Sequence, residues 1–232
     1  MKIFNTIIGA IYPNKCIACG EIINENIFLC DYCVRNIKRL DLGNYCLNCG
    51  FENKNCCCEQ SIYRFAGIVS VFENSDIAKR AYYSYKFSKN QHYAKFFALE
   101  MSNAVNEVFS EIKFDFVCSV PSSKKFLFSK RYDHSKYLAQ GIAKQLSLEY
   151  KKDILKCIKF KKPQHKSSYK ERLTNVEGVF DFNFRIENKT VLLVDDIRTT
   201  AATLDECAKI LLFAGADAVY CVTLLSKGKK TN

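Results

Sequence analysis

The stretch Val191-Leu192-Leu193-Val194-Asp195-Asp196-Ile197-Arg198-Thr199-Thr200-Ala201-Ala202-Thr203 decides the fold of this chain. Its apolar start has the length and composition of a strand buried in a parallel sheet. Two adjacent carboxylates follow, at the point where open α/β sheets bind ligands. The small hydroxyl and methyl side chains after them open a helix, whose first amides and dipole attract phosphate. The stretch therefore predicts a sugar-phosphate site, with carboxylates on ribose hydroxyls or Mg²⁺ and amides on a 5′-phosphate.

The surrounding sequence supplies the other elements of an α/β fold. Alternating or continuous apolar residues predict strands over 66–72, 114–120 and 218–225, and apolar residues at helical spacing predict helices over 76–87, 93–108 and 134–147. After the decisive stretch, Leu204, Cys207, Ala208, Leu211 and Leu212 share one helical face, and Gly215 is expected to end that helix in a left-handed conformation. We therefore expect a mostly parallel sheet with flanking helices.

Most of the 13 cysteines lie near the N-terminus. Cys16-x-x-Cys19 and Cys30-x-x-Cys33 form one set of four. Cys46-x-x-Cys49 begins a second set, which Cys56-Cys57-Cys58 completes. In a reducing compartment this spacing indicates structural zinc held by four thiolates rather than disulfides. Adjacent cysteines point in different directions, so we expect Cys56 and Cys58 to be the ligands; a redox-sensitive or degenerate cluster is the alternative for this set.

The net charge of +11 is unevenly distributed. Residues 1–60 carry equal numbers of acidic and basic side chains. The excess of positive charge is concentrated in two lysine-rich stretches later in the chain. A lysine-rich surface either keeps the protein soluble or binds the phosphates of a ligand or of a nucleic-acid backbone. The candidate nucleic-acid contacts are Lys125, Lys130, Arg131, Lys161, Lys162, Lys166 and Arg172. Residues 151–178, which contain most of these, are polar enough for a flap over a ligand.

The chain shows no apolar stretch of the ~20 residues that a membrane span needs. Residues 1–12 are apolar but short, and they lack the small-residue cleavage site of a signal peptide. We expect a cytoplasmic protein with no membrane association.

The stretch 191–203 closely resembles the phosphoribosyl-pyrophosphate (PRPP) loop of type I phosphoribosyltransferases, and the chain with its cysteine-rich start resembles the ComF family of competence-associated, phosphoribosyltransferase-like proteins. The resemblance implies a zinc-ribbon module over 1–62 and a phosphoribosyltransferase-like domain over 63–228. It implies that Asp195 and Asp196 bind the ribose hydroxyls or Mg²⁺ and are the catalytic pair of any transfer. Around PRPP, it implies contacts to the 5′-phosphate from Thr199, Thr200, Ala201, Ala202 and Thr203, and to the diphosphate from Ser122, Ser123 and Lys124.

Two departures from the family pattern concern the ligand. The family's Thr-Thr-Gly-Ala-Thr is Thr-Thr-Ala-Ala-Thr here, with Ala201 in the glycine position. If that backbone needs a positive φ, alanine costs about 1 kcal/mol, and we expect weakened phosphate binding. Thr199 stands where hypoxanthine–guanine enzymes have an aspartate, which disfavours a 6-oxopurine substrate.

The resemblance implies a competence protein that binds PRPP with Mg²⁺, handles single-stranded DNA and works with other competence-machinery proteins. An active phosphoribosyltransferase acting on an unidentified base or amine is the alternative, and a zinc-ribbon adaptor with a vestigial phosphoribosyl fold is a third. The aromatic residues of 81–87 either stack on bases or pack in the core.

Overall fold

The computed structural model describes the chain at residues 13–25, 27–56, 58, 63–87, 92–122, 133–158 and 178–227. At its centre is a five-stranded sheet in the order β1-β7-β6-β2-β3, and each neighbouring pair is parallel. The strands are β1 (Gly67–Glu73), β2 (Phe116–Ser119), β3 (Glu149–Tyr150), β6 (Thr190–Arg198) and β7 (Ala218–Ser226). The expected α/β class with a mostly parallel sheet is confirmed.

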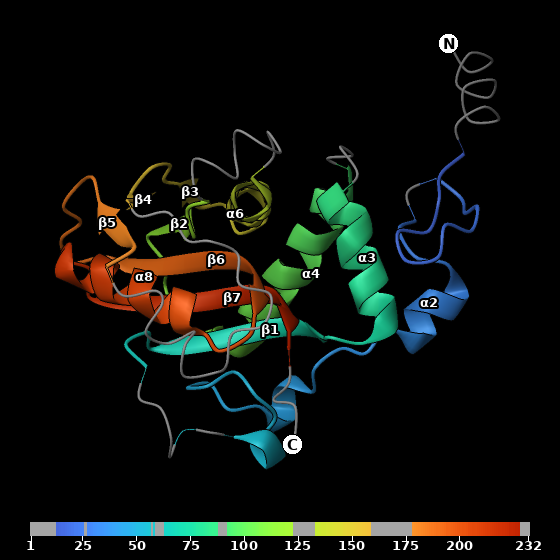
Figure 1. Ribbon diagram of the computed structural model, residues 1–232, viewed down its shortest axis with the longest axis horizontal. Helices are drawn as coiled ribbons and strands as arrows, with labels where there is room; N and C mark the ends of the chain where they lie inside the picture. Colours follow the sequence, from blue (N-terminus) through green and yellow to red (C-terminus); the bar gives the residue numbers. More distant parts are fainter. Residues whose placement is uncertain are drawn as a thin grey trace, which may run out of the picture.

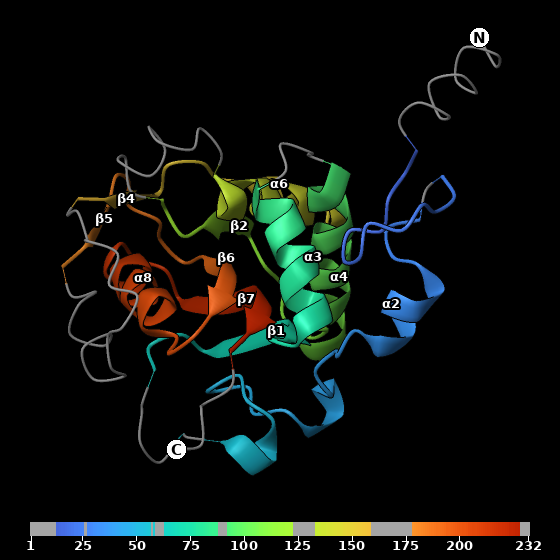
Figure 2. The same ribbon diagram turned by 45° about the vertical axis from the view of Figure 1, so that its right-hand side comes forward.

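Helices cover both faces of this sheet (Figure 1 and Figure 2). On one face lie α3 (Asp76–Phe87), α4 (His92–Val108) and α6 (His134–Gln145), and on the other lies α8 (Ala202–Phe213). Leu192 and Val194 of β6 pack with the first group, whereas Val191 and Leu193 pack with α8; all four are fully buried. Because both faces of β6 are covered, its sequence is a continuous apolar run rather than an alternating one.

The sequence placed these elements well but ended β6 too early. Strands β1, β2 and β7 and helices α3, α4, α6 and α8 differ from their predicted ranges by small shifts at the ends, whereas β3 was not predicted. The predicted strand 191–194 continues to Arg198, because its ladder with β7 runs on through the pairs Asp195–Thr223 and Arg198–Ser226. The acidic pair therefore lies within β6, not after it.

A short antiparallel sheet flanks the lysine-rich region. It consists of β4 (Leu155–Cys157) and β5 (Phe180–Phe182), with Cys157 opposite Phe180. The two ends of the segment expected to form a flap are thus adjacent. Residues 159–177 of that segment lie outside the described ranges.

The cysteine-rich segment contacts the sheet unit at two places. Its first part, with α2 (Asp31–Asn36), lies beside α3 and α4 (Figure 1), where Phe28 stacks on Phe96 with ring centroids 5.2 Å apart. Its second part, with the 3-10 turns η1 (Leu42–Asn44) and η2 (Asn53–Asn55), lies beside β1, and the amide of Ile68 donates to the carbonyl of Leu47 at 2.8 Å. The first part therefore meets the helices and the second meets the sheet edge.

The C-terminus of α8 ends as the sequence predicts. Gly215 has φ 108°, and its amide donates to Leu212 O at 3.0 Å. A Cβ at this position would lie 2.6 Å from the carbonyl oxygen of Ile186. The turn therefore requires glycine for its left-handed backbone and for this close approach. Within the described ranges, no helix combines the length and apolar character needed to cross a bilayer.

Candidate functional site

The acidic pair lies at the point where the connections of the sheet diverge. β6 is hydrogen-bonded to β7 on one side and to β2 on the other. The chain leaves β6 for α8 on one face of the sheet, and the chain after β2 leads to α6 on the opposite face. Open α/β sheets bind ligands in the crevice between such connections. Because Ser119 pairs with Val194, Ser122 follows β2 alongside Asp195 and Asp196.

Side chains from two helices hold the carboxylates of the pair. Ser135, in the first turn of α6, donates to Oδ1 of Asp195 at 3.0 Å. Tyr82, in α3, donates its hydroxyl to Oδ2 of Asp196 at 2.6 Å. Lys86 donates to the Tyr82 hydroxyl at 2.7 Å, and its Nζ lies 3.7 Å from Asp196 Oδ2. Hydrogen bonds thus orient both carboxylates, and a fixed orientation lowers the entropy cost of binding a ligand.

The electrostatics of the pair favour a cation or hydroxyl donors. Burial and the neighbouring charge of Asp196 raise the pKa of Asp195 to about 8. Burial, followed by the charge of Asp196, also raises the pKa of Tyr82, so its hydroxyl remains a proton donor at neutral pH. Two adjacent, half-buried carboxylates resist ionising together unless positive charge or hydrogen-bond donors approach them. Mg²⁺, which prefers oxygen ligands, or the hydroxyls of a ribose would meet that need.

The turn between β6 and α8 combines a left-handed residue with a helix N-terminus. Ala201 has φ 58° and ψ 1°, is 4% exposed, and immediately precedes the first residue of α8. The condition set out from the sequence, a positive φ at the family's glycine position, is therefore met. Thr200 accepts a hydrogen bond from the Ala202 amide at 3.4 Å. Because alanine has no capping side chain, it does not compete with an anion for the first-turn amides of α8.

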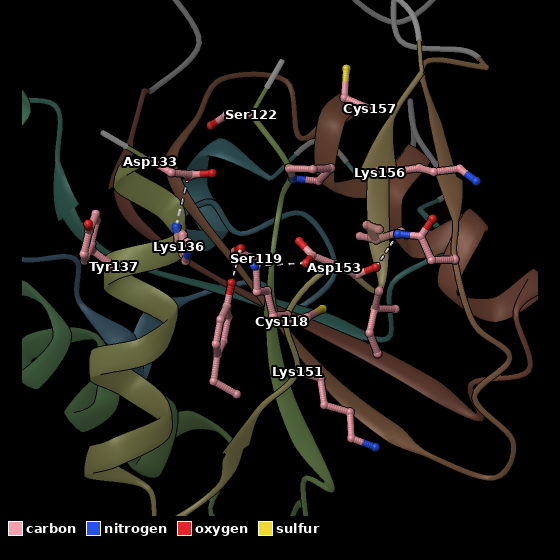
Figure 3. Close-up of a pocket in the computed structure, with 16 residues that line it drawn as sticks. Cys118, Ser119, Ser122, Asp133, Lys136, Tyr137, Lys151, Asp153, Lys156 and Cys157 are labelled. Atoms are coloured by element: carbon pink, nitrogen blue, oxygen red, sulfur yellow. Dashed lines mark hydrogen bonds and ion pairs between the residues drawn. The ribbon is translucent and has the colours of Figure 1, made fainter. Parts of the chain in front are cut away.

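A cavity of about 370 Å³ lies beside this site, on the β3 side of β2 (Figure 3). Ser122 and Asp133 lie together at one rim, and Ser122 connects the cavity to the turn after β2. The acidic pair does not line this cavity. The amino groups of Lys151 and Lys156 extend away from it in Figure 3, and Lys156 pairs with Asp181 at 3.1 Å. The cavity is thus a neighbour of the acidic site rather than part of it.

Several predicted contacts fall outside the described residues. Thr199, Thr200, Ala202 and Thr203 lie with Ala201 at the start of α8, and Ser122 follows β2, the strand paired with β6. The remaining diphosphate and nucleic-acid candidates lie outside the described ranges, as does Cys57; those candidates are Ser123, Lys124, Lys125, Lys130, Arg131, Lys161, Lys162, Lys166 and Arg172.

Each set of four cysteines is arranged so that it could hold a metal ion. The sulfur atoms of Cys16, Cys19, Cys30 and Cys33 lie within 4.8 Å of one another, and so do those of Cys46, Cys49, Cys56 and Cys58. The Sγ atoms of Cys19 and Cys30 are 3.6 Å apart, and those of Cys49 and Cys56 are 3.8 Å apart. A tetrahedral ion with bonds of about 2.3 Å to sulfur places its ligands about 3.8 Å from one another. Both sets therefore fit zinc.

The contacts of Tyr82, Lys86 and Ser135 with the acidic pair were not predicted from the sequence. Tyr82 and Lys86 stand four residues apart, so they share one face of a helix. That spacing was the available signal, but it does not say which strand the face meets. In the aromatic stretch 81–87, Tyr85 is fully buried and packs in the core, whereas Phe87 is 64% exposed; stacking on bases stays a prediction.

Comparison with known proteins gives one family match and several relatives. Residues 133–232 match the family described as phosphoribosyl transferase domain. The chain is 23% identical over 207 residues to the DNA utilization protein YhgH of Salmonella typhi, covering 88% of this chain and 86% of the relative. It is 27% identical over 105 residues to YhgH of Escherichia coli (strain K12), covering 45% and 46%. It is 24% identical over 219 residues to Competence protein F of Haemophilus influenzae, covering 88% and 93%.

Proposed function

Because this chain belongs to the ComF family of competence-associated, phosphoribosyltransferase-like proteins, we propose that it binds PRPP with Mg²⁺ and handles single-stranded DNA in the cytoplasm during natural transformation. The names of the relatives and the phosphoribosyl transferase domain support a ComF-type competence role. The ligand, the DNA and the compartment are the proposed part.

One observation supports PRPP most strongly: the acidic pair, oriented by neighbouring side chains near the end of β6, is followed by a turn with a left-handed residue and then by a helix N-terminus. Asp195 and Asp196, held by Ser135, Tyr82 and Lys86, would take the ribose hydroxyls and Mg²⁺. Residues 199–203 would surround the 5′-phosphate with amides and hydroxyls. Ser122, with Ser123 and Lys124 after it, would hold the diphosphate.

The cysteine clusters are proposed as two structural zinc sites. Four thiolates per ion close the coordination sphere and leave no position for catalysis. Burial opposes ionisation of Cys46, yet hydrogen bonds led by the Cys49 amide lower its pKa to about 7. A thiol that ionises near neutral pH is a ready metal ligand. We retain residues 1–62 as the zinc-ribbon module and 63–228 as the phosphoribosyltransferase-like domain.

Single-stranded DNA is supported by charge and by exposed aromatic rings near the acidic pair. The chain carries a net charge of +11. Tyr83 and Phe87 are 51% and 64% exposed on α3, and their rings lie 6.0 Å apart at 21°, close to parallel. Unpaired bases stack on such rings without regard to sequence. The basic residues of 123–132 and 159–177 would supply phosphate contacts.

Phosphoribosyl transfer is the second candidate activity. The raised pKa of Asp195, about 8, favours it, because perturbed carboxyls near neutrality are common among catalytic groups. Release of pyrophosphate from PRPP in the presence of a panel of bases, lost in Asp195→Asn, would establish transfer. If the protein binds PRPP but releases no pyrophosphate, the binding function stands and transfer is excluded.

Thermal-shift titrations with Mg²⁺–PRPP and with an oligothymidine, separately and together, test the proposal. At a ligand concentration of 100 times Kd, binding stabilises the folded state by about 2.7 kcal/mol, a rise of roughly 5–11 °C. Asp195→Asn should abolish the PRPP shift, whereas Asp181→Asn, an acid paired with Lys156, should retain it. Oligothymidine affinity should fall with salt at a log–log slope of about 0.7 per phosphate contact. If Mg²⁺–PRPP does not change the Tm of the wild-type protein, the ligand assignment is refuted.

A further inference from the structure

Arg198 connects the phosphate loop to the second cysteine cluster. It is the last residue of β6, directly before Thr199, and its side chain is 1% exposed. Its guanidinium donates to Cys49 O at 2.9 Å, to Gly50 O at 2.5 Å, and to the hydroxyl of Ser226. Its Cζ also lies 3.7 Å from the centroid of the Phe51 ring. A permanently charged group is thus buried against the backbone of the Cys46-x-x-Cys49-Gly50 turn.

The Cys49 and Gly50 carbonyls reach the Arg198 guanidinium only while this turn keeps its conformation. The Gly50 amide donates to Cys46 O, and the Cys46 amide donates to Phe51 O, both at 2.8 Å. Gly50 has φ 71°, and a Cβ there would lie 2.8 Å from the Tyr45 hydroxyl and 3.2 Å from Arg198 Nε. Glycine at this position therefore permits the guanidinium to approach. Four thiolates on one ion would hold the turn closed.

We propose that a zinc ion on Cys46, Cys49, Cys56 and Cys58 fixes the conformation of the phosphate loop through Arg198, so that Arg198 is a positioning residue for residues 199–203. When the cluster opens, the Cys49 and Gly50 carbonyls leave the guanidinium, and a buried charge that loses its partners forces rearrangement around it. The loop that follows Arg198 directly holds Ala201, three residues on, in a strained left-handed conformation that persists only while its surroundings enforce it. The consequence for PRPP affinity rests on the proposed function; the coupling between cluster and loop does not.

The first cysteine cluster provides an internal control. Cys19 is followed by Gly20 with φ 79°, as Cys49 is followed by Gly50. A Cβ at Gly20 would have nothing within 4 Å. The first cluster packs against α3 and α4, whereas the turn that contacts Arg198 belongs to the second cluster and lies beside β1. Equivalent changes at the two clusters therefore separate general loss of stability from specific loss of the contact with Arg198.

The first test compares Cys56→Ser with Cys19→Ser, each of which removes an exposed ligand thiol. Zinc content, hydrogen exchange of the 199–204 amides and PRPP affinity are measured on the full chain. We expect Cys56→Ser to raise amide exchange in the loop about tenfold and weaken PRPP by a similar factor, the effect of losing one hydrogen bond to a charged group. Cys19→Ser should leave both unchanged. Equal loop exchange in the two variants would overturn the inference.

The second test leaves every thiol in place, so that it does not depend on survival of a ligand variant. Gly50→Ala should retain its zinc yet raise exchange in the 199–204 amides, whereas Gly20→Ala, with the same backbone strain, should not. Arg198→Lys, which keeps the charge and loses the paired donors, should reproduce the effect of Gly50→Ala. A protected loop in both Gly50→Ala and Arg198→Lys overturns the coupling. If these two variants raise amide exchange in the loop but the wild-type protein does not bind PRPP, the ligand assignment is refuted and the coupling between cluster and loop stands.

Discussion

Replacing Ala201 by glycine measures the strain in the phosphate loop. Ala201 adopts φ 58° although it is not glycine, and it is almost completely buried. The next residue, Ala202, is also an alanine, is 5% exposed, and begins α8. The two positions differ mainly in backbone conformation. Comparison of Ala201→Gly with Ala202→Gly therefore isolates the cost of the left-handed alanine.

The opposing terms can be estimated for each position. Loss of a buried methyl costs about 0.8 kcal/mol, and the extra freedom of glycine in the unfolded chain costs a further 0.4–1 kcal/mol or so. Ala202→Gly should thus lower the free energy of unfolding by about 1–2 kcal/mol. At Ala201 the same losses are offset by relief of about 1–2 kcal/mol of left-handed strain. Ala201→Gly should therefore be close to neutral.

Thermal unfolding of the two variants, without ligand, provides the measurement. For a domain of this size, 1 kcal/mol corresponds to roughly 2–4 °C. The Tm of Ala201→Gly should exceed that of Ala202→Gly by about 2–8 °C. Equal melting temperatures would show that the left-handed conformation carries no strain, and the reasoning from the glycine position would be wrong.

PRPP affinity shows where the strain is released. The left-handed backbone of Ala201 belongs to the fold of the turn, so we expect the folded protein to carry most of the strain whether or not PRPP is bound. The free energy of PRPP binding gained in Ala201→Gly should therefore be smaller than the strain energy that the substitution relieves in the folded protein. A large gain in affinity with no gain in stability would mean that the unliganded loop relaxes away from φ 58°.

Three further predictions concern the acidic pair and the end of α8. The pKa of Asp195, raised by burial and then by Asp196 to about 8, means that the folded chain keeps a proton that the unfolded chain releases near pH 4. Stability should accordingly fall as the pH rises from about 4 to 8, and the Tm advantage of Asp195→Asn should grow over that interval; a constant difference would contradict it. Tyr82→Phe, which removes the donor to Asp196, should weaken Mg²⁺–PRPP binding several-fold by calorimetry, whereas Tyr83→Phe, at an exposed ring, should not. Gly215→Ala should lower the free energy of unfolding by more than about 1 kcal/mol in urea titrations, and Gly43→Ala, where the nearest atom to an added Cβ is 3.5 Å away, serves as the control.

Local sequence was sufficient for the features that depend on neighbours along the chain. The apolar run 191–194, the helical spacing of 204–212 and the glycine at 215 each predicted an element that the structure contains. The cysteine spacing likewise predicted the two groups of sulfur atoms, because a metal turn is built from residues close in sequence. These predictions agree with the structure because the geometry of each feature is set by residues close together in the sequence.

Contacts between distant segments were decided by the tertiary structure. The pairing of Tyr82 and Ser135 with the acidic pair depends on how α3 and α6 rotate against β6, and helical periodicity leaves that rotation open. The burial of Arg198 against Cys49 and Gly50 joins residues about 150 positions apart. Sequence by itself determined the α/β fold, the acidic pair and the cysteine sets, since backbone propensity and spacing are local. Only packing decided which side chains orient the carboxylates and that the second cysteine cluster contacts Arg198, because burial and charge pairing are properties of the assembled chain.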